Sequence, residues 1–589
     1  MRLLEDMGVF EARRRFLAVA GYSATSLMLI GATMTGLTAC SRGPRDDRGT
    51  GGEADGRTED GRTDGAGGSA GQQGLGGAAG EAILRRGNGP DPDSLDPQKA
   101  RTVEAQNILR DLYECLTSVA QDGGVAPGVA THWESSPDGR IYTFHLRPDA
   151  RWSNGDRVVA ADFVAGLRRL VDPATASPYA QVVEAITRAR EIIAGRLPPA
   201  ALGVTAPDDA TLVVTLEGPT PYLPALLAHP STAPAPRSTL AGGGSAPARA
   251  TFTRGGAMVT NGAFVLQEWV PGSHVVAARN HRYWNDAATR LDAVEFLSIA
   301  DENAELTRYR AGELDITAVV PRDELEWIRA SIPRELHLAP QLTTYFYGFN
   351  LDRPQFRDAR VRRALSMVVD RDLLAREVLR AGERPAFGWV PPGIHDYTPQ
   401  SADYRALSMP ERIAHGRQLY SEAGYSTQRP LRFELRYNSS EVNDRLAVAA
   451  ASMWKEALGA EVRLAAEEFK SLLHDIDRRD VDLFVASWSA DYNDAYAFAQ
   501  YLKSDFGVNL PHYRSAEYDA LVDQASASVD STRRRALLEQ AERVALRDQP
   551  LIPIYFYVNK HLVKPRVAGW YDNPLNVVYS KDLGLIASR

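Results

Sequence analysis

The stretch Leu551-Ile-Pro-Ile-Tyr-Phe-Tyr-Val558 is a nearly continuous apolar run close to the end of the chain. Such a run is typical of a strand that is buried on both faces of a sheet. Residues 141–147 and 211–217 alternate apolar and polar side chains, which predicts half-buried strands. Residues 160–167 and 361–369 have the spacing of amphipathic helices. Strands and helices mix along the chain without a fixed repeat, so we expect an α/β fold.

Composition narrows the class of protein. The 589 residues are 44% hydrophobic and 24% charged, which excludes general disorder and a polytopic membrane protein. The length predicts about four units of ~150 residues. A net charge of -8 argues against a protein that binds nucleic acid. Cys40 and Cys115 are the only cysteines, so a disulfide scaffold and a four-cysteine zinc site are both excluded.

The first 40 residues predict export. Arg13, Arg14 and Arg15 form a basic start, the chain carries no charge from there to Cys40, and the stretch ends Leu37-Thr38-Ala39-Cys40. This pattern describes a signal peptide over residues 1–39, and its end matches the lipobox of bacterial lipoproteins, in which the cysteine sulfur is acylated. A transmembrane anchor is the alternative, weakened by the many small residues in the run. The arginines fit both ordinary and twin-arginine export.

Residues 40–80 are rich in Gly, Asp, Arg and Ala and almost without large apolar side chains. Such a segment cannot bury enough surface to offset its ordering entropy, so we expect a disordered tether with a reach of roughly 35 Å. We therefore predict that the protein is lipid-anchored through Cys40 to the cell membrane and faces the periplasm or the cell exterior.

The body shows no catalytic pattern. From residue 81 onward there is no H-E-x-x-H, no phosphate-binding P-loop, no G-x-S-x-G elbow and no C-x-x-C. Residues 491–495 begin like a calcium loop, but Ala495 breaks the alternation of ligands. We therefore expect neither enzyme activity, nor a metal, nor a cofactor.

A resemblance covers residues 84–585, nearly the whole mature body. The matching stretches are residues 89–97 (GPDPDSLDP), 109–114 (LRDLYE), 142–147 (YTFHLR), 150–156 (ARWSNGD), 172–179 (DPATASPY), 261–264 (NGAF), 309–316 (YRAGELDI), 490–493 (ADYN) and 553–558 (PIYFYV). In this order and spacing the chain resembles the solute-binding lipoproteins of oligopeptide ABC importers, the family 5 extracellular solute-binding proteins.

The resemblance implies the two-lobed periplasmic-binding-protein fold of type II, in its large peptide-binding class, with an extra subdomain in lobe I. Lobes that close on a ligand bury it by hinge motion. The expected boundaries are residues 81–113, 237–342 and 559–589 for lobe I, residues 114–236 for its subdomain, and residues 343–558 for lobe II.

The resemblance also implies a function: a monomeric receptor that captures oligopeptides and delivers them to a membrane permease. Such a receptor must bind a peptide backbone while it tolerates many side chains. Main-chain hydrogen bonds to an extended ligand ignore sequence, and water-filled pockets accept varied side chains. A carboxylate is required at the ligand's α-ammonium, because a buried ammonium without a partner costs several kcal/mol.

Asp491 occupies the ammonium-binding position of the family within Ala490-Asp491-Tyr492-Asn493. The alternative is that Asp491 caps a helix that starts near Ala495. By the same correspondence, the expected ligand-binding residues that offer backbone groups are Val103, Ser487 and Ser489. Those expected to line side-chain pockets are Tyr179, Phe469, Trp488 and Tyr557, for each of which an ordinary core role is the alternative.

Three positions depart from the family. Well-studied relatives place basic side chains, which bind the ligand carboxylate, where this chain has Ser366, Asn443 and Val485. We keep Asn443 among the expected ligand-binding residues, although it cannot supply a charge. Either another cation serves, with Arg362, Arg363 and Lys470 as candidates, or the carboxylate end is not fixed.

Other functions stay open. The protein could bind cell-wall peptides, signalling peptides or another solute such as a nickel chelate. A secreted hydrolase on the same lipid anchor is a less favoured alternative, since the chain has no nucleophile or metal motif.

Overall fold

The computed structural model describes residues 81–236 and 258–586. The predicted signal peptide, Cys40 and the predicted tether lie outside these residues. In the part of the chain that is described, no helix is long and apolar enough to cross a membrane.

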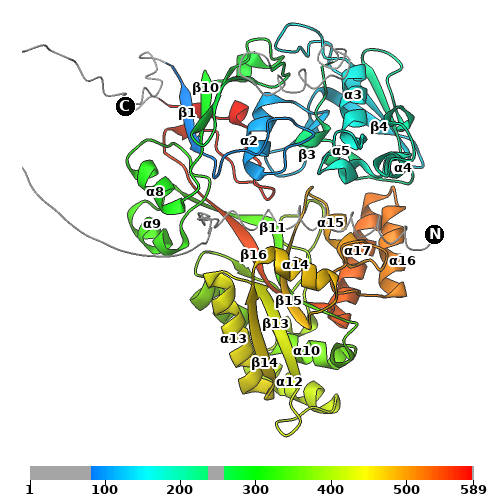
Figure 1. Ribbon diagram of the computed structural model, residues 1–589, viewed down its shortest axis with the longest axis vertical. Coiled ribbons are helices and arrows are strands. Elements are labelled where there is room, and N and C mark those ends of the chain that lie inside the picture. Colours follow the sequence, from blue (N-terminus) through cyan, green and yellow to red (C-terminus); the bar gives the residue numbers. More distant parts are fainter. Residues whose placement is uncertain (1–80, 237–257, 587–589) are drawn as a thin grey trace, which may run out of the picture. The chain divides into compact units, whose positions relative to one another are not determined.

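The first sheet has four strands in the order β1-β10-β9-β8. Its strands are β1 (Ile83–Gly87), β10 (Ala293–Leu297), β9 (His274–Arg279) and β8 (Phe264–Val270). β1 runs parallel to β10, and the other pairs are antiparallel. The sheet therefore joins the start of the body to a segment about 200 residues later, as Figure 1 shows for β1 and β10.

A second four-stranded sheet has the order β4-β5-β7-β6. Its antiparallel strands are β4 (Ala130–Ser135), β5 (Ile141–Leu146), β7 (Thr211–Thr215) and β6 (Val204–Thr205). Two of these strands, and the helix α3 (Ala160–Val171), lie where the sequence pattern predicts them. The helix buries Phe163, Leu167 and Leu170 in the core that both four-stranded sheets share.

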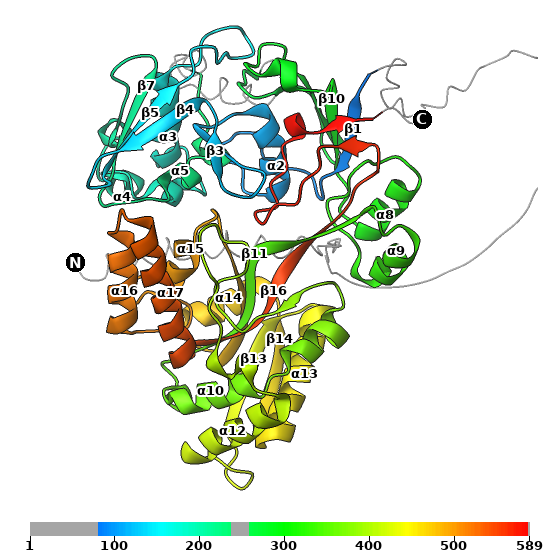
Figure 2. The same ribbon diagram turned by 180° about the vertical axis from the view of Figure 1, so that it is seen from behind.

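The third sheet has six strands in the order β12-β16-β11-β15-β13-β14. Its strands are β12 (Arg384–Pro385), β16 (Leu551–Leu562), β11 (Leu336–Phe349), β15 (Leu483–Ser489), β13 (Arg432–Asn438) and β14 (Glu461–Glu467). The apolar stretch at residues 551–558 forms most of β16, where it is almost wholly buried. β11 and β16 pair from Leu336 and Leu562 to Gly348 and Leu551, and they connect the two halves seen in Figure 2.

Helices cover both faces of the six-stranded sheet, because each face carries its own row of aromatic side chains. On one face, α10 (Ala359–Met367), α12 (Met409–Glu422) and α13 (Glu441–Leu458) enclose Tyr347 and Trp454. On the other face, α16 (Ala516–Ser526) and α17 (Ser531–Asp548) enclose Phe346, Trp389 and Tyr501. The two smaller sheets and the large sheet make up two lobes, and the fold is the mixed α/β, two-lobed fold that the sequence predicts.

Three more helices complete the parts that bear on the site. They are α2 (Val103–Leu112), α14 (Phe469–Asp477) and α15 (Tyr496–Ala499). Thr102 begins α2 by accepting a hydrogen bond from the Ala105 amide, and Glu468 begins α14 by accepting bonds from the Lys470 and Ser471 amides. Side-chain oxygens at these positions satisfy amides that a helix leaves without partners.

Candidate ligand-binding site

The predicted ligand-binding residues of lobe II gather at one edge of the large sheet. β14 and β15 both run parallel to β13, so the carboxyl ends of these strands meet at the same edge. Asn443 follows β13 and Phe469 follows β14, while Ser489 ends β15 just before Asp491. Ligands of α/β sheets bind outside the carboxyl ends of the strands, so this edge is the expected place for a site.

Polar side chains extend this edge across the sheet. Ser487 on β15 lies opposite Tyr345 on β11, which lies opposite Tyr555 on β16. The Tyr345 and Tyr555 rings stack with their centroids 4.7 Å apart, and the Tyr557 ring lies 5.0 Å from that of Tyr555. Burial raises the pKa of Tyr557, so its phenol is neutral at physiological pH. Hydroxyls of Ser487 and Tyr557 therefore lie side by side next to the carboxyl end of β15.

Asp491 is a carboxylate without a counter-charge. No described residue donates a hydrogen bond to its side chain or forms an ion pair with it. Water reaches the side chain, which is exposed, yet the protein around it removes part of its hydration and raises its pKa to about 6. Asp491 is therefore open to water and at the same time flanked by protein. Such a group is ready to accept a cation.

The structure does not use Asp491 as a helix cap. The following helix, α15, starts at Tyr496, and the Tyr496 amide donates to Asp494 Oδ1 at 2.8 Å. Asp494 is also held by Arg534, whose two terminal nitrogens lie 2.7 and 2.8 Å from its oxygens. Asp494 therefore orders the loop, and Asp491 stays available for another partner.

Two predicted residues of lobe I lie on or against α2. Val103, at the start of α2, is exposed. The Tyr179 hydroxyl accepts a hydrogen bond from Gln106 Nε2 at 2.8 Å and donates to the Arg101 carbonyl at 3.3 Å. Burial raises the pKa of Tyr179, and the charge of Asp491 raises it further, which places Asp491 close to Tyr179. Tyr179 of lobe I thus lies near Asp491 of lobe II.

A second contact between the lobes lies beside Asp491. The Tyr222 ring stacks on Tyr492, with centroids 5.1 Å apart, and on Tyr496, with centroids 5.0 Å apart. The Arg534 guanidinium lies 5.9 Å from the centre of the Tyr222 ring. Tyr222 belongs to the predicted subdomain of lobe I, so the loop that carries Asp491 is one place where this subdomain touches lobe II.

The side chains of two predicted ligand-binding residues, Trp488 and Asn443, are buried and bond to other groups of the protein. Trp488 is 4% exposed, its indole lies 4.7 Å from Tyr501, and its Nε1 donates to the Ala497 carbonyl. Side chains alternate along a strand, so Trp488 points away from the face that Ser487 and Ser489 share. Asn443 is 8% exposed, and its side chain accepts from the Tyr345 hydroxyl at 2.8 Å. Its amide donates to the carbonyl and the side chain of Asn438.

The candidate positions for a carboxylate-binding cation, except Lys470, are also occupied elsewhere. Ser366 and Val485 are buried, and Ser366 Oγ bonds to Tyr404 and Arg371. Arg362 donates to four backbone carbonyls of lobe II. Arg363 pairs with Asp403, and Lys470 is an exposed residue of the first turn of α14.

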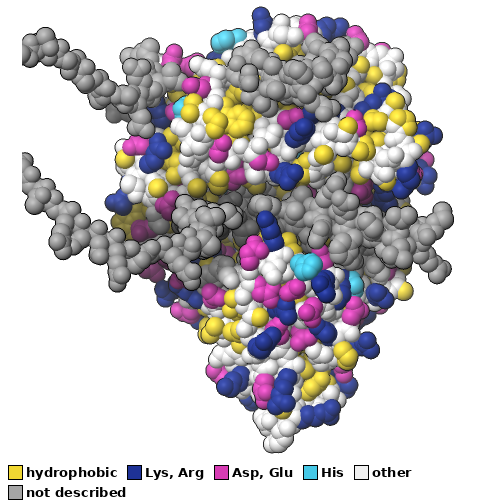
Figure 3. All heavy atoms as spheres, viewed as in Figure 1, with side chains coloured by type: hydrophobic (Ala, Val, Ile, Leu, Met, Phe, Trp, Pro, Cys, Tyr) yellow, Lys and Arg dark blue, Asp and Glu magenta, His cyan; other side chains and the backbone are white. Residues whose placement is uncertain are grey.

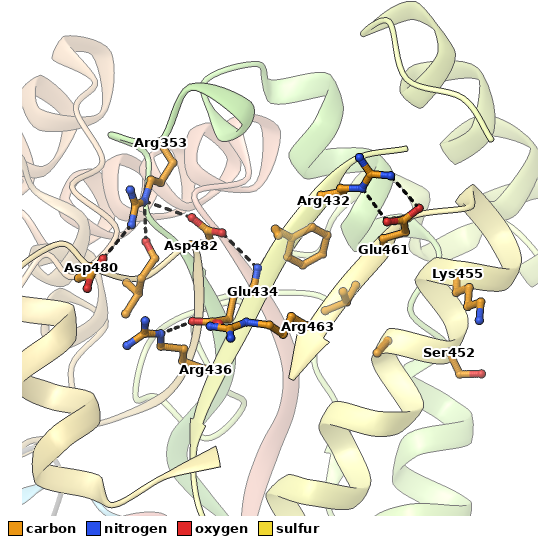
Figure 4. A pocket seen from close by; sticks show the side chains of 15 residues that line it. Arg353, Arg432, Glu434, Arg436, Ser452, Lys455, Glu461, Arg463, Asp480 and Asp482 are labelled. Carbon is orange, nitrogen blue, oxygen red and sulfur yellow. Dashed lines mark hydrogen bonds and ion pairs between the residues drawn. The ribbon is translucent and has the colours of Figure 1, made fainter. Parts of the chain in front are cut away.

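A sizeable hollow lies at the opposite end of β15. Its volume is about 900 Å³, and it lies beside residues 480–482, which precede the strand, whereas Asp491 follows it. Figure 4 shows Arg432 facing Glu461 and Arg353 facing Asp482, at 2.6 and 3.1 Å. Cations and anions also alternate over lobe II in Figure 3. These two ion pairs neutralise four of the charges that line the hollow.

Among the residues with described positions, no group of three or more His, Cys, Asp or Glu could hold a metal ion. Cys115 is buried, and burial raises the pKa of its thiol to about 12. A thiol this protonated is a poor nucleophile.

Comparison with known proteins identifies the class. The profile of the bacterial extracellular solute-binding proteins, family 5 Middle, matches residues 124–509. The chain belongs to this family. It is 39% identical over 507 residues to the periplasmic oligopeptide-binding protein OppA of Escherichia coli, covering 85% of this chain and 92% of that protein.

Two further relatives are similar to this chain over most of their length. The chain is 41% identical over 506 residues to the probable deoxycholate-binding periplasmic protein YgiS of Escherichia coli, with coverage of 85% and 93%. The solved structure of the periplasmic murein tripeptide binding protein MppA, in its unliganded open form, matches with a TM-score of 0.79 at 37% identity. That match covers 86% of this chain and 98% of the other. The protein is thus an extracellular solute-binding protein with the fold of its relatives.

Several residues of the site carry no sequence signal of their own. Gln106, Tyr222 and Arg534 lie far apart along the chain and look like ordinary helix or loop residues. Their roles depend on which segments the fold brings together.

Proposed function

We propose that this solute-binding protein captures oligopeptides between Tyr179 of lobe I and the carboxyl end of β15 in lobe II. Asp491 binds the α-ammonium group of the peptide. Backbone groups at Val103, Ser487 and Ser489 pair with the peptide main chain, as in strand addition, which is blind to side chains. The protein delivers the peptide to an ABC permease and performs no chemistry on it.

One observation carries the proposal: the Asp491 carboxylate is partly desolvated and has no partner among the described residues. An unpaired carboxylate in such a setting costs free energy, and a ligand ammonium group restores the lost interaction. Half-buried Phe469 and Tyr557 border the same edge of the sheet and suit pockets for ligand side chains.

The proposed domain organisation follows the sequence boundaries. A signal peptide over residues 1–39 directs export, Cys40 receives the lipid, and residues 40–80 form a tether. Residues 81–113, 237–342 and 559–589 form lobe I, residues 114–236 its subdomain, and residues 343–558 lobe II. The receptor works as a monomer. Membrane attachment that is lost in Cys40→Ser, while peptide binding is kept, supports the anchor.

The test of function is to purify the mature protein, denature it and identify the released molecules by mass spectrometry. We expect intact peptides with free amino termini. A bile acid, which has a carboxylate but no ammonium group, would contradict the proposal. Peptide cleavage by the purified protein would instead support the hydrolase alternative. Cell-wall peptides among the ligands would narrow the substrate class without changing the mechanism.

Affinity for peptides should fall in mild acid. The pKa of Asp491 is about 6 in the ligand-free protein, so the binding form is mostly ionised at pH 7 and mostly protonated at pH 5. The ligand ammonium stays protonated over this range. Calorimetric titration should therefore show about tenfold weaker binding at pH 5 than at pH 7. In Asp491→Asn the two affinities should be nearly equal, and an unchanged affinity in the wild type would contradict the expectation.

A further inference from the structure

Arg110 is a cation without a counter-charge in lobe I. It lies in the last turn of α2, and its guanidinium donates only to neutral amide oxygens, to Asn107 Oδ1 at 3.3 Å and to Gln106 Oε1 at 3.5 Å. No carboxylate of the described residues forms an ion pair with it. The side chain is half-buried, and burial lowers its pKa, as expected for a charge that has lost hydration.

The uncharged groups around Arg110 do not supply a negative charge to pair with its guanidinium. Tyr179, Tyr579 and Cys115 lie close to it, and burial raises the pKa of each, so they are neutral. Burial keeps the nearby His229 neutral as well, with a pKa lowered to about 3.

Two carboxylates lie in the same region, and neither forms an ion pair with Arg110. The Asp111 side chain accepts from the Ser580 amide at 2.9 Å and faces Arg86. The Glu114 oxygens accept from the Tyr283 hydroxyl and from the Trp284 indole, at 2.6 and 2.7 Å. Arg110 therefore has no direct ion-pair partner in this region, although the charge of Asp111 raises its pKa slightly against the effect of burial.

Arg110 is joined to the proposed peptide site. Gln106 bonds at once to the Tyr179 hydroxyl and to Arg110, so one amide side chain links the two. The charge of Asp491 raises the pKa of Tyr179, and the charge of Arg110 lowers it. The Tyr179 hydroxyl thus lies between a negative and a positive group. Arg110 also lines a cavity of about 20 Å³, which is too small for a ligand group larger than water.

From this geometry we infer that Arg110 binds a carboxylate of the peptide whose ammonium group is held by Asp491; the inference rests on the proposed function. Val103 and Arg110 are seven residues apart on one helix, which is about 10 Å. An extended peptide covers that length in about three residues. The carboxylate is therefore the terminal group of a tripeptide or an acidic side chain near the third position. Arg110 thus supplies the positive charge that Ser366, Asn443 and Val485 do not supply.

The test compares tri-alanine with tri-alanine amide by calorimetric titration. The wild type should bind the free acid at least tenfold more tightly than the amide. Arg110→Gln should reduce that preference below threefold while it retains affinity for the amide, which shows that the site is still folded. Arg110→Lys should give an intermediate preference. Arg101→Gln, which removes an exposed neighbouring charge, should keep the wild-type preference and controls for net charge.

A second pair of ligands distinguishes the two sources of the carboxylate. Ala-Ala-Glu-Ala-Ala is compared with Ala-Ala-Gln-Ala-Ala in the wild type and in Arg110→Gln. A preference that depends on Arg110 only in the tri-alanine pair assigns the terminal carboxylate, and one that appears only in the pentapeptide pair assigns the side chain. An equal preference in wild type and Arg110→Gln, for both pairs, overturns the inference but leaves the peptide receptor intact. If the wild type binds none of these peptides, the proposed function itself fails.

Discussion

Asp491→Asn should weaken the binding of peptides with a free α-amino group by more than ~2 kcal/mol, or about 30-fold, as expected when one partner of a desolvated charge pair is removed. The substitution keeps the size of the side chain but removes its charge. Calorimetric titration measures the change directly. N-acetylated versions of the same peptides should bind poorly to the wild type, and the substitution should affect their affinity little.

A matched control separates the charge of Asp491 from the net charge of the lobe. Asp480→Asn removes a carboxylate just before β15, at the far end of the strand from Asp491, where it pairs with Arg353. That variant should bind free and acetylated peptides as the wild type does. Equal wild-type affinity for free and acetylated peptides would refute the role of Asp491.

The second large effect concerns the stability of lobe II. Glu542 on α17 is 3% exposed and accepts four hydrogen bonds. The amides of Trp389 and Val390 donate to Oε1, both at 2.8 Å, while the Tyr397 hydroxyl and the Gln400 amide donate to Oε2, at 2.6 and 3.0 Å. Glu542→Ala leaves two buried and two half-buried donors without a partner and should lower the free energy of unfolding by about 4 kcal/mol.

Urea unfolding followed by tryptophan fluorescence measures this loss, because Trp389 lies in the affected loop. Glu542→Gln is the conservative control: its carbonyl oxygen still accepts, so the loss should be about half as large. A loss below about 1 kcal/mol in Glu542→Ala would show that the loop does not depend on this carboxylate. The same loop contacts Asn493 near the ligand site, through the His395 amide at 2.8 Å, so Glu542→Ala should also weaken peptide binding.

Local patterns in the sequence were enough to predict the fold class. The apolar run at residues 551–558 forms the buried strand β16, and the alternating segments form β5 and β7. The helix predicted over residues 361–369 is observed as α10 at Ala359–Met367, because Asp358 accepts from the Arg360 amide and begins the helix earlier. Periodicity identifies an element, whereas a side-chain cap sets its first residue.

For the candidate site, the resemblance predicts which residues take part but not which face of the strand each side chain occupies. The resemblance grouped Ser487, Trp488 and Ser489 together, although successive side chains on a strand point to opposite faces. The structure separates them accordingly, with Trp488 in the core behind the sheet. The alternation was visible in the sequence, but the face that the ligand meets was not, since that depends on the packing of α15 to α17.

Other features could not be read from the sequence at all. The hydrogen bond from Gln106 to Tyr179 joins residues 73 positions apart, and the bonds of Glu542 reach back more than 140 positions. Arg110 is one of many arginines, and it becomes notable only because the fold leaves it without a carboxylate. Such contacts follow from tertiary packing, which no local pattern specifies.

The most direct measurement is a crystal structure of the protein in complex with tri-alanine. We expect the peptide to lie between Tyr179 and the carboxyl end of β15, with its ammonium nitrogen about 2.7–2.9 Å from an Asp491 oxygen. A peptide bound elsewhere, or one whose ammonium group pairs with a different residue while Asp491 faces bulk water, would contradict this expectation.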